Sequence, residues 1–111
     1  MFAANLIEID DNNFSDVVAT STVPVLVDFT AAWCAPCRAI APHVGAVATQ
    51  YGERLRVVTC DVDANRALAE RFDVRSMPTL LLFNEGKVVG QIVGAVPRHR
   101  IEKLVEGVLA A

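Results

Sequence analysis

The stretch FTAAWCAPCRAIAPHV, residues 29–44, joins an apolar run to a helical pattern and carries two of the chain's three cysteines. The run VPVLVDF (23–29) is apolar on both faces, which is typical of a central strand in a sheet that is covered on both sides. From Cys34 to Tyr51 apolar residues recur at helical spacing and predict a long helix. Cys34 and Cys37 therefore fall where a buried strand turns into a helix.

The rest of the chain alternates between strand and helix patterns. The further strands are expected at NLIEI (5–9), LRVVTCDVD (55–63), TLLLF (79–83) and KVVGQIV (87–93), the last two forming an antiparallel hairpin around the turn NEG (84–86). The further helices are expected after cap-type residues at Asp11, Asn12 and Asn13, after Asp63, and near Pro97. This order predicts one α/β domain over residues 1–111, in which four helices flank a five-stranded mixed sheet of parallel strands and an antiparallel hairpin.

The composition of the chain argues against several classes of protein. With 111 residues, 53% of them hydrophobic, and a net charge of -3, it fits one globular domain and not a nucleic-acid-binding surface. No apolar run approaches the roughly 18 residues of a membrane span. The N-terminus also lacks the basic start and the apolar stretch of a signal peptide. We therefore expect a cytoplasmic protein with no nucleic-acid and no membrane partner.

The position of the cysteine pair at a helix N-terminus indicates thiol chemistry. Unpaired backbone N–H groups and the helix dipole favour negative charge there by ~0.3–1 kcal/mol at exposed sites. The Cys34 thiol should therefore ionise more readily than a free one, and the thiolate is the nucleophile. Cys37 lies one turn further on, where we expect it to be more buried than Cys34 and less reactive. Cys34 can then attack a disulfide, and Cys37 can resolve the mixed disulfide.

Two other uses of such a pair stay open at this point. A C-x-x-C pair is also half of a zinc site. The chain has no second pair, and Cys60 with His43 or His99 is a poor substitute, so no metal site is expected. The other alternative is a scaffold subunit in which redox chemistry is incidental. Such a protein would keep its cellular role when Cys34 and Cys37 are both replaced by serine.

Four segments resemble the thioredoxin family along nearly the whole chain: VLVDFTAAWCAPCRAIAP (25–42), DVDAN (61–65), RSMPTLLLF (75–83) and VGA (93–95). The resemblance implies the thioredoxin fold and a monomeric protein-disulfide reductase with no bound cofactor, whose Cys34–Cys37 disulfide is redox-active. One implied partner is a thioredoxin reductase, which supplies electrons from NADPH through a flavin. The other implied partners are client proteins with disulfides, such as ribonucleotide reductase, methionine sulfoxide reductase and peroxiredoxins.

The motif itself separates types of enzyme within this fold. Trp33, Cys34, Pro36 and Cys37 match the active-site motif of the family. Pro36 favours a reductase, because oxidases and isomerases of the same fold usually carry histidine at this position; an oxidase or isomerase remains a third alternative. Ala35 replaces the usual glycine, and residues between the two cysteines tune the reduction potential.

Asp28 interrupts the apolar central strand. A buried carboxylate is costly unless it is paired or protonated, so burial should raise its pKa. It is then a candidate proton acceptor for Cys37 when that thiol attacks the mixed disulfide, a role that the resemblance also implies. The alternative is an acid at an exposed strand end. The family often has a lysine nearby, at a position that aligns here with Thr59, so the carboxyl lacks that positive partner.

Two further segments complete the site that the resemblance implies. The family keeps a cis-proline at the position of Pro78, and the backbone of Met77 can pair with an extended client segment as an added strand does. Gly94 would admit a client backbone closely. An apolar rim around the nucleophile is expected from Trp33, Met77, Val93 and Gly94. Alternatively, Pro78 only begins a strand, and residues 93–94 only end one.

Cys60, the third cysteine, lies between Val58 and Val62 in a predicted strand. This alternation predicts an inward-facing core thiol. A secondary regulatory thiol is the alternative.

Overall fold

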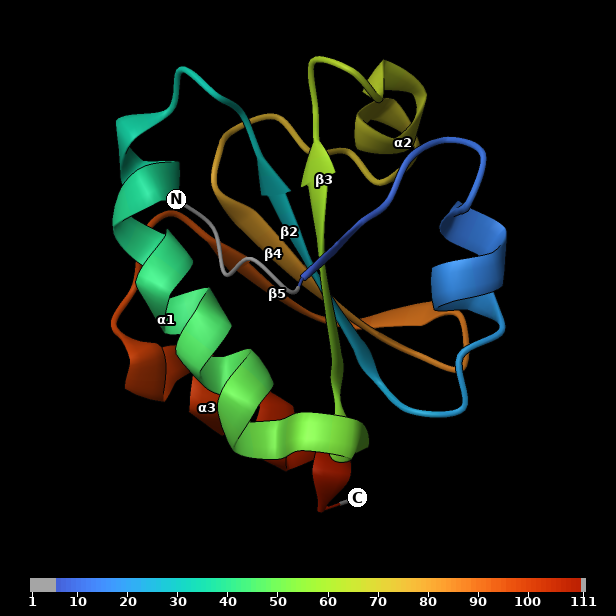
Figure 1. Cartoon of the computed structure of the whole chain (residues 1–111), viewed down its shortest axis with the longest axis vertical. Coiled ribbons are helices and arrows are strands. Elements are labelled where there is room, and N and C mark those ends of the chain that lie inside the picture. The colour runs from blue at the N-terminus through green and yellow to red at the C-terminus, as the bar shows by residue number, and fades with distance from the viewer. Residues whose placement is uncertain (1–5, 111) are drawn as a thin grey trace.

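The computed structural model describes residues 6–110 and contains one twisted sheet with helices on both faces (Figure 1). The strands are β1 (Ile7–Glu8), β2 (Val25–Thr30), β3 (Arg56–Asp61), β4 (Thr79–Asn84) and β5 (Lys87–Val93). The helices are α1 (Ala35–Tyr51), α2 (Arg66–Arg71) and α3 (Arg98–Leu109), with a π-helical segment η1 (Ser15–Ala19) and a 3₁₀ turn η2 (Gly52–Arg54). None of the helices within residues 6–110 is long and apolar enough to cross a membrane. The predicted α/β order is confirmed; Asn5, at the start of the first predicted strand, lies outside the described residues.

Strand β2 lies at the centre of the sheet, whose order is β1-β3-β2-β4-β5. It pairs in parallel with β3 and antiparallel with β4, and β4 and β5 form the predicted hairpin. All six residues of β2 are buried, as its apolar run predicted. The register sets Asp28 directly beside Thr59 on one side and Leu80 on the other.

The side chains of β2 divide between two cores, because successive residues of a strand point to opposite faces of the sheet. Val25, Val27 and Phe29 pack with residues of η1 and α2. Leu26 points to the other face and packs with the apolar stripes of α1 and α3. Figure 1 shows these two helices side by side, and they are in contact. Asp28 shares the face of Leu26, so it lies on the side of the sheet that α1 and α3 cover.

The predicted helix caps are wrong in two places. None of the residues 11–13 caps η1 through its side chain; instead Asp10 Oδ1 accepts hydrogen bonds from two of their N–H groups, each at 2.8 Å. Asp63 does not cap α2, whose flanking residue is Asn65. The N–H of Asp63 instead donates to Asp61 Oδ1 at 2.9 Å. In both loops an aspartate closes a local turn before the helix begins, and this turn replaces the cap.

Candidate active site

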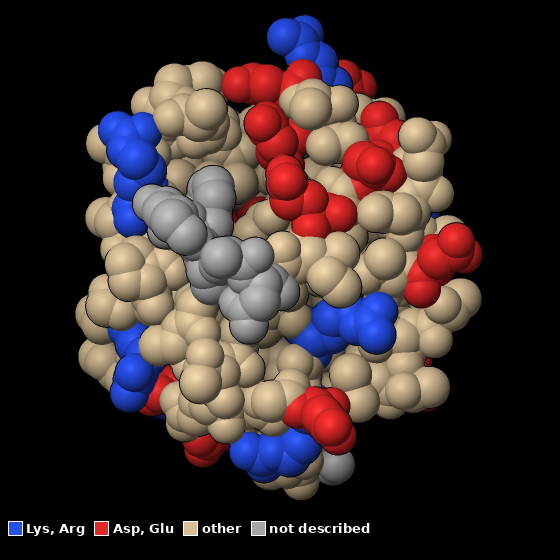
Figure 2. Space-filling model, in the orientation of Figure 1, with Lys and Arg blue, Asp and Glu red and all other residues tan. Residues whose placement is uncertain are grey.

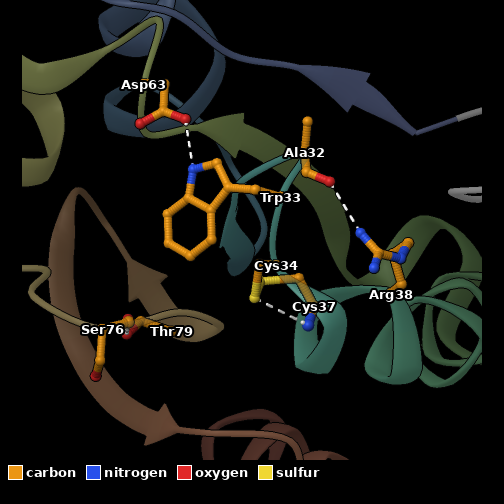
Figure 3. The surroundings of a disulfide bond; sticks show 8 residues. All are labelled: Ala32, Trp33, Cys34, Cys37, Arg38, Asp63, Ser76 and Thr79. Carbon is orange, nitrogen blue, oxygen red and sulfur yellow. Dashed lines mark hydrogen bonds between the residues drawn. A yellow bond between two sulfur atoms is a disulfide. The ribbon is translucent and has the colours of Figure 1, made fainter.

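Cys34 and Cys37 meet where the chain passes from β2 into α1, and a disulfide joins them (Figure 3). Cys34 is the N-cap of α1, in an extended backbone conformation, and its Sγ accepts a hydrogen bond of 3.2 Å from the N–H of Cys37. Pro36 occupies the first turn, where its missing N–H costs no helical hydrogen bond. The predicted place of Cys34 at the helix N-terminus is confirmed, and a backbone donor points at its sulfur.

The difference in burial between the two cysteines is small in this disulfide-bonded state, although Cys37 is the more buried of the two, as predicted. Cys34 is 3% exposed and Cys37 is 1% exposed. Both residues are enclosed at the strand-to-helix turn, and the helical pattern could not indicate this enclosure. The two sulfurs differ instead in hydrogen bonding, because only that of Cys34 accepts a backbone N–H among the described residues.

Asp28 is almost completely buried, 1% exposed, on the face of β2 that α1 covers. Within residues 6–110, neither of its carboxyl oxygens has a hydrogen-bond partner and no salt bridge reaches it. Burial raises the pKa of this carboxyl from 3.8 to about 7. The predicted burial and pKa shift are confirmed, and the alternative of an exposed strand end is wrong. Thr59 is the neighbour of Asp28 on β3, as expected.

The predicted rim residues come from three segments of the chain. Trp33 and Val93 are 65% and 53% exposed, while Met77 is half-buried. The peptide bond between Met77 and Pro78 is cis. The N–H of Gly94 donates a 2.8 Å hydrogen bond to the carbonyl oxygen of Pro78, which ties the end of β5 to the proline loop. Gly94 has φ +94°, a conformation that favours glycine.

The proline loop approaches the cysteine pair. In Figure 3 the loop between Ser76 and Thr79 projects toward Cys34. Thr79 Oγ1 closes this loop by donating a 2.6 Å hydrogen bond to the carbonyl oxygen of Ser76. Met77 packs against the core cluster that contains both cysteines. The structure therefore brings residues 76–79 and 93–94 together on the side of the disulfide.

One contact of the site was missed by the sequence analysis. Trp33 Nε1 donates a 2.8 Å hydrogen bond to Asp63 Oδ2, although Asp63 was expected to cap a helix (Figure 3). On the other side of the turn, Arg38 Nη1 donates a 2.9 Å bond to the carbonyl oxygen of Ala32. The sequence does hold a signal for the contact between Trp33 and Asp63, because the segment DVDAN (61–65) comes at the end of β3, which runs parallel to β2. The carboxyl ends of two adjacent parallel strands lie at the same edge of a sheet.

Cys60 is a core thiol, as predicted. It is completely buried in β3, and burial raises its pKa to about 12. A thiol of this kind stays protonated and unreactive. Over the part of the chain that the structure describes, no three His, Cys, Asp or Glu side chains are grouped so that they could hold a metal ion.

The burial of Asp28 predicts how stability depends on pH. Because the pKa of this carboxyl is about 7 in the folded protein and 3.8 in the unfolded chain, the folded state keeps a proton that the unfolded state loses. The free energy of unfolding should therefore fall as pH rises from about 4 to about 7, and then level out. Asp28→Asn, neutral at every pH, should lack this fall and be more stable at pH 8 by roughly 2–4 kcal/mol.

Urea unfolding of the oxidised protein at several pH values between 4 and 8 measures this difference. Asp16→Asn, which neutralises an exposed carboxyl in η1, is the matched control and should follow the native curve. Equal pH dependence in the native protein and in Asp28→Asn would contradict the assignment.

Comparison with known proteins agrees with this geometry over most of the chain. The family model described as Thioredoxin matches residues 5–107. Thioredoxin 1 of Synechococcus elongatus is 44% identical over 98 residues, which cover 88% of this chain and 92% of that protein. Thioredoxin 1 of Nostoc sp. is 42% identical over 99 residues, covering 89% and 92%. Thioredoxin of Haemophilus influenzae is 39% identical over 102 residues, covering 92% and 95%. Similarity of this extent means that the chain belongs to the thioredoxin family and is a protein thiol–disulfide oxidoreductase.

Proposed function

We propose that Cys34 and Cys37 act in sequence on the disulfides of client proteins. In the reduced protein the Cys34 thiolate attacks one sulfur of the client, which forms a mixed disulfide and releases the other client sulfur as a thiolate. Cys37 then attacks the Cys34 sulfur, releases the second client sulfur, and forms the Cys34–Cys37 disulfide. Two electrons pass to the client in total. The observation that carries this assignment is the hydrogen bond from the N–H of Cys37 to the Cys34 sulfur at the start of α1.

Asp28 is proposed as the proton acceptor for the second step. Cys37 must lose its proton before it attacks the mixed disulfide. Asp28 lies on the face of β2 that α1 covers, and Cys37 lies in the first turn of α1, with its side chain packed in the cluster of the opposite face. With a pKa of about 7, the carboxyl is poised to accept a proton near neutral pH, directly or through a water molecule. The neighbour of Asp28 on β3 is Thr59, which carries no positive charge that would lower the pKa of the carboxyl.

The apolar rim is proposed to bind the client. Its exposed members, Trp33 and Val93, offer apolar area beside the disulfide. Met77 can pair its backbone with an extended client segment, and its flexible side chain adapts to clients of different shape. Ala35 and Pro36 set the conformation of the turn between the cysteines, and Gly94 leaves room for the client backbone.

The remaining functional assignments rest on membership in the family. We propose that residues 1–111 form a single thioredoxin domain that works as a monomer in the cytoplasm. A thioredoxin reductase, using NADPH and a flavin, would return the disulfide to the dithiol. Ribonucleotide reductase, methionine sulfoxide reductase and peroxiredoxins are the proposed classes of client. Pro36 favours this reductase direction over an oxidase or isomerase.

Substitution of single cysteines tests the order of the two steps. The native protein, supplied with NADPH and a thioredoxin reductase, should reduce the disulfides of insulin. Cys34→Ser should be inactive and should form no mixed disulfide. Cys37→Ser should turn over no insulin but should accumulate a mixed disulfide through Cys34, because the resolving thiol is missing. Mass spectrometry of the trapped species identifies the bonded cysteine.

Cys60→Ala is the control for these variants, because its thiol is buried in the core, and it should keep native turnover. A mixed disulfide trapped on Cys37 in the Cys34→Ser variant would reverse the assigned roles.

The role of Asp28 is tested by following the two steps separately in single turnovers. Asp28→Asn should form the mixed disulfide at the native rate but resolve it about tenfold to a hundredfold more slowly at pH 7, because it cannot accept the proton of Cys37. The native rate of resolution should rise with pH through an inflection near 7, and the variant should lack this inflection. Unchanged resolution in Asp28→Asn at every pH would remove Asp28 from the mechanism.

A further inference from the structure

The side chain of Trp33 is held in place by one hydrogen bond rather than by packing. The residue is 65% exposed, so neighbouring atoms restrict its ring little. Its Nε1–H donates to Asp63 Oδ2 at 2.8 Å, and Figure 3 shows the indole reaching from the turn before Cys34 toward Asp63. A large exposed side chain next to the reacting sulfur would otherwise sample several orientations on the picosecond-to-nanosecond timescale.

The acceptor is itself fixed by the loop that follows β3. The N–H groups of Asp63 and Ala64 donate to Asp61 Oδ1 at 2.9 and 3.4 Å. The N–H of Val62 donates to the carbonyl oxygen of Thr30 at 2.9 Å, which joins this loop to the end of β2. The loop after β3 that carries Asp63 is therefore tied to the end of β2, the strand that leads into the cysteine turn, so Asp63 can hold Trp33 in a fixed place relative to Cys34.

We infer that Asp63 is a positioning residue for client binding, whose side chain holds the Trp33 indole in one orientation as a ready-made wall beside Cys34. The inference rests on the proposed function, in which Trp33 belongs to the client-binding rim. An indole that is already ordered in the free protein does not lose conformational entropy when the client binds, so the affinity for protein clients is higher. The reaction of the sulfurs themselves does not require it.

Negative charge is the rival explanation, because the surroundings of this loop are acidic. Figure 2 shows acidic side chains gathered over the end of β3, and Glu8, Asp10, Asp11 and Asp61 line a hollow of about 560 Å³ there. Asp63→Asn separates the two explanations, since it removes the charge but keeps an oxygen that can accept the indole N–H. Asp63→Ala removes both. Asp11→Asn removes one exposed charge of the same hollow and leaves the indole bond intact.

The first measurement is made on the protein without a client. Because Trp33 is the only tryptophan of the chain, the tryptophan fluorescence reports on this side chain alone. Time-resolved fluorescence anisotropy should show a larger fast component for the indole in Asp63→Ala than in the native protein. Asp63→Asn and Asp11→Asn should resemble the native protein. An equally restricted indole in Asp63→Ala would overturn the inference without any appeal to activity.

The second measurement is the steady-state reduction of insulin. Asp63→Ala should raise the KM for insulin about threefold to tenfold, the range expected for one side chain that must be ordered on binding, with little change in kcat. The rate with hydroxyethyl disulfide, which is too small to reach the wall, should stay native. Asp63→Asn should keep a near-native KM. A KM raised equally by Asp63→Asn and Asp11→Asn would mean that charge is responsible, and the inference would be wrong.

A double-variant cycle with Trp33→Phe completes the test, because phenylalanine keeps an apolar ring but has no N–H to donate. In that background Asp63→Ala should change the KM for insulin by less than about twofold, since coupled residues lose their separate effects. A full effect of Asp63→Ala in the Trp33→Phe protein would contradict positioning through the indole. Failure of the native protein to reduce insulin would instead refute the proposed function, while the anisotropy result would still report on Asp63.

Discussion

The hydrogen bond from the N–H of Cys37 to the Cys34 sulfur is the interaction on which the rest of the site depends. It exists because β2 is buried on both faces, ends at Thr30, and leads through a short turn into α1. The first N–H groups of a helix have no partner within the helix, so one of them is available to a sulfur at the N-cap. In the reduced protein the same donor and the helix dipole favour a thiolate at Cys34.

The central position of β2 also explains why Asp28 is unusual. The Asp28 carboxyl lies beside Thr59 and Leu80 with no partner among the described residues, so we expect it to make the folded state less stable at pH 8 than a neutral side chain would. The same burial brings its pKa to about 7, which is the value that proton transfer at neutral pH needs. The lower stability that we predict and the proton transfer that we propose for Asp28 therefore share one physical cause, the burial of its carboxyl.

Most of the fold followed from the sequence because its elements are strongly patterned. The apolar run at 23–29 predicted a strand covered on both faces, and the apolar stripe from Cys34 onward predicted a long helix. Asp28 could be identified because one acid stood out in an apolar strand, and Cys60 because the apolar residues Val58 and Val62 stand two positions before and after it. These features are local, and local pattern is what a sequence displays most directly.

The features that the sequence analysis missed depend on contacts between distant segments. Trp33 and Asp63 are thirty residues apart, and their hydrogen bond forms only because the ends of β2 and β3 lie together. The pattern that suggested a cap at Asp63 was real, but Asp61 closes a tighter turn there. The near-complete burial of Cys34 is likewise a property of the assembled turn, since helical spacing gives the position of a residue and not its enclosure.

Alkylation of the reduced protein by iodoacetamide at pH 7 tests the central claim most directly, namely that the start of α1 selects one cysteine as the nucleophile. Mass spectrometry of peptides gives the rate at each of the three cysteines. Cys34 should react first, Cys37 at least about tenfold more slowly, and Cys60 only after unfolding. If Cys37 or Cys60 reacts as fast as Cys34, the helix N-terminus does not select the nucleophile and the account is wrong.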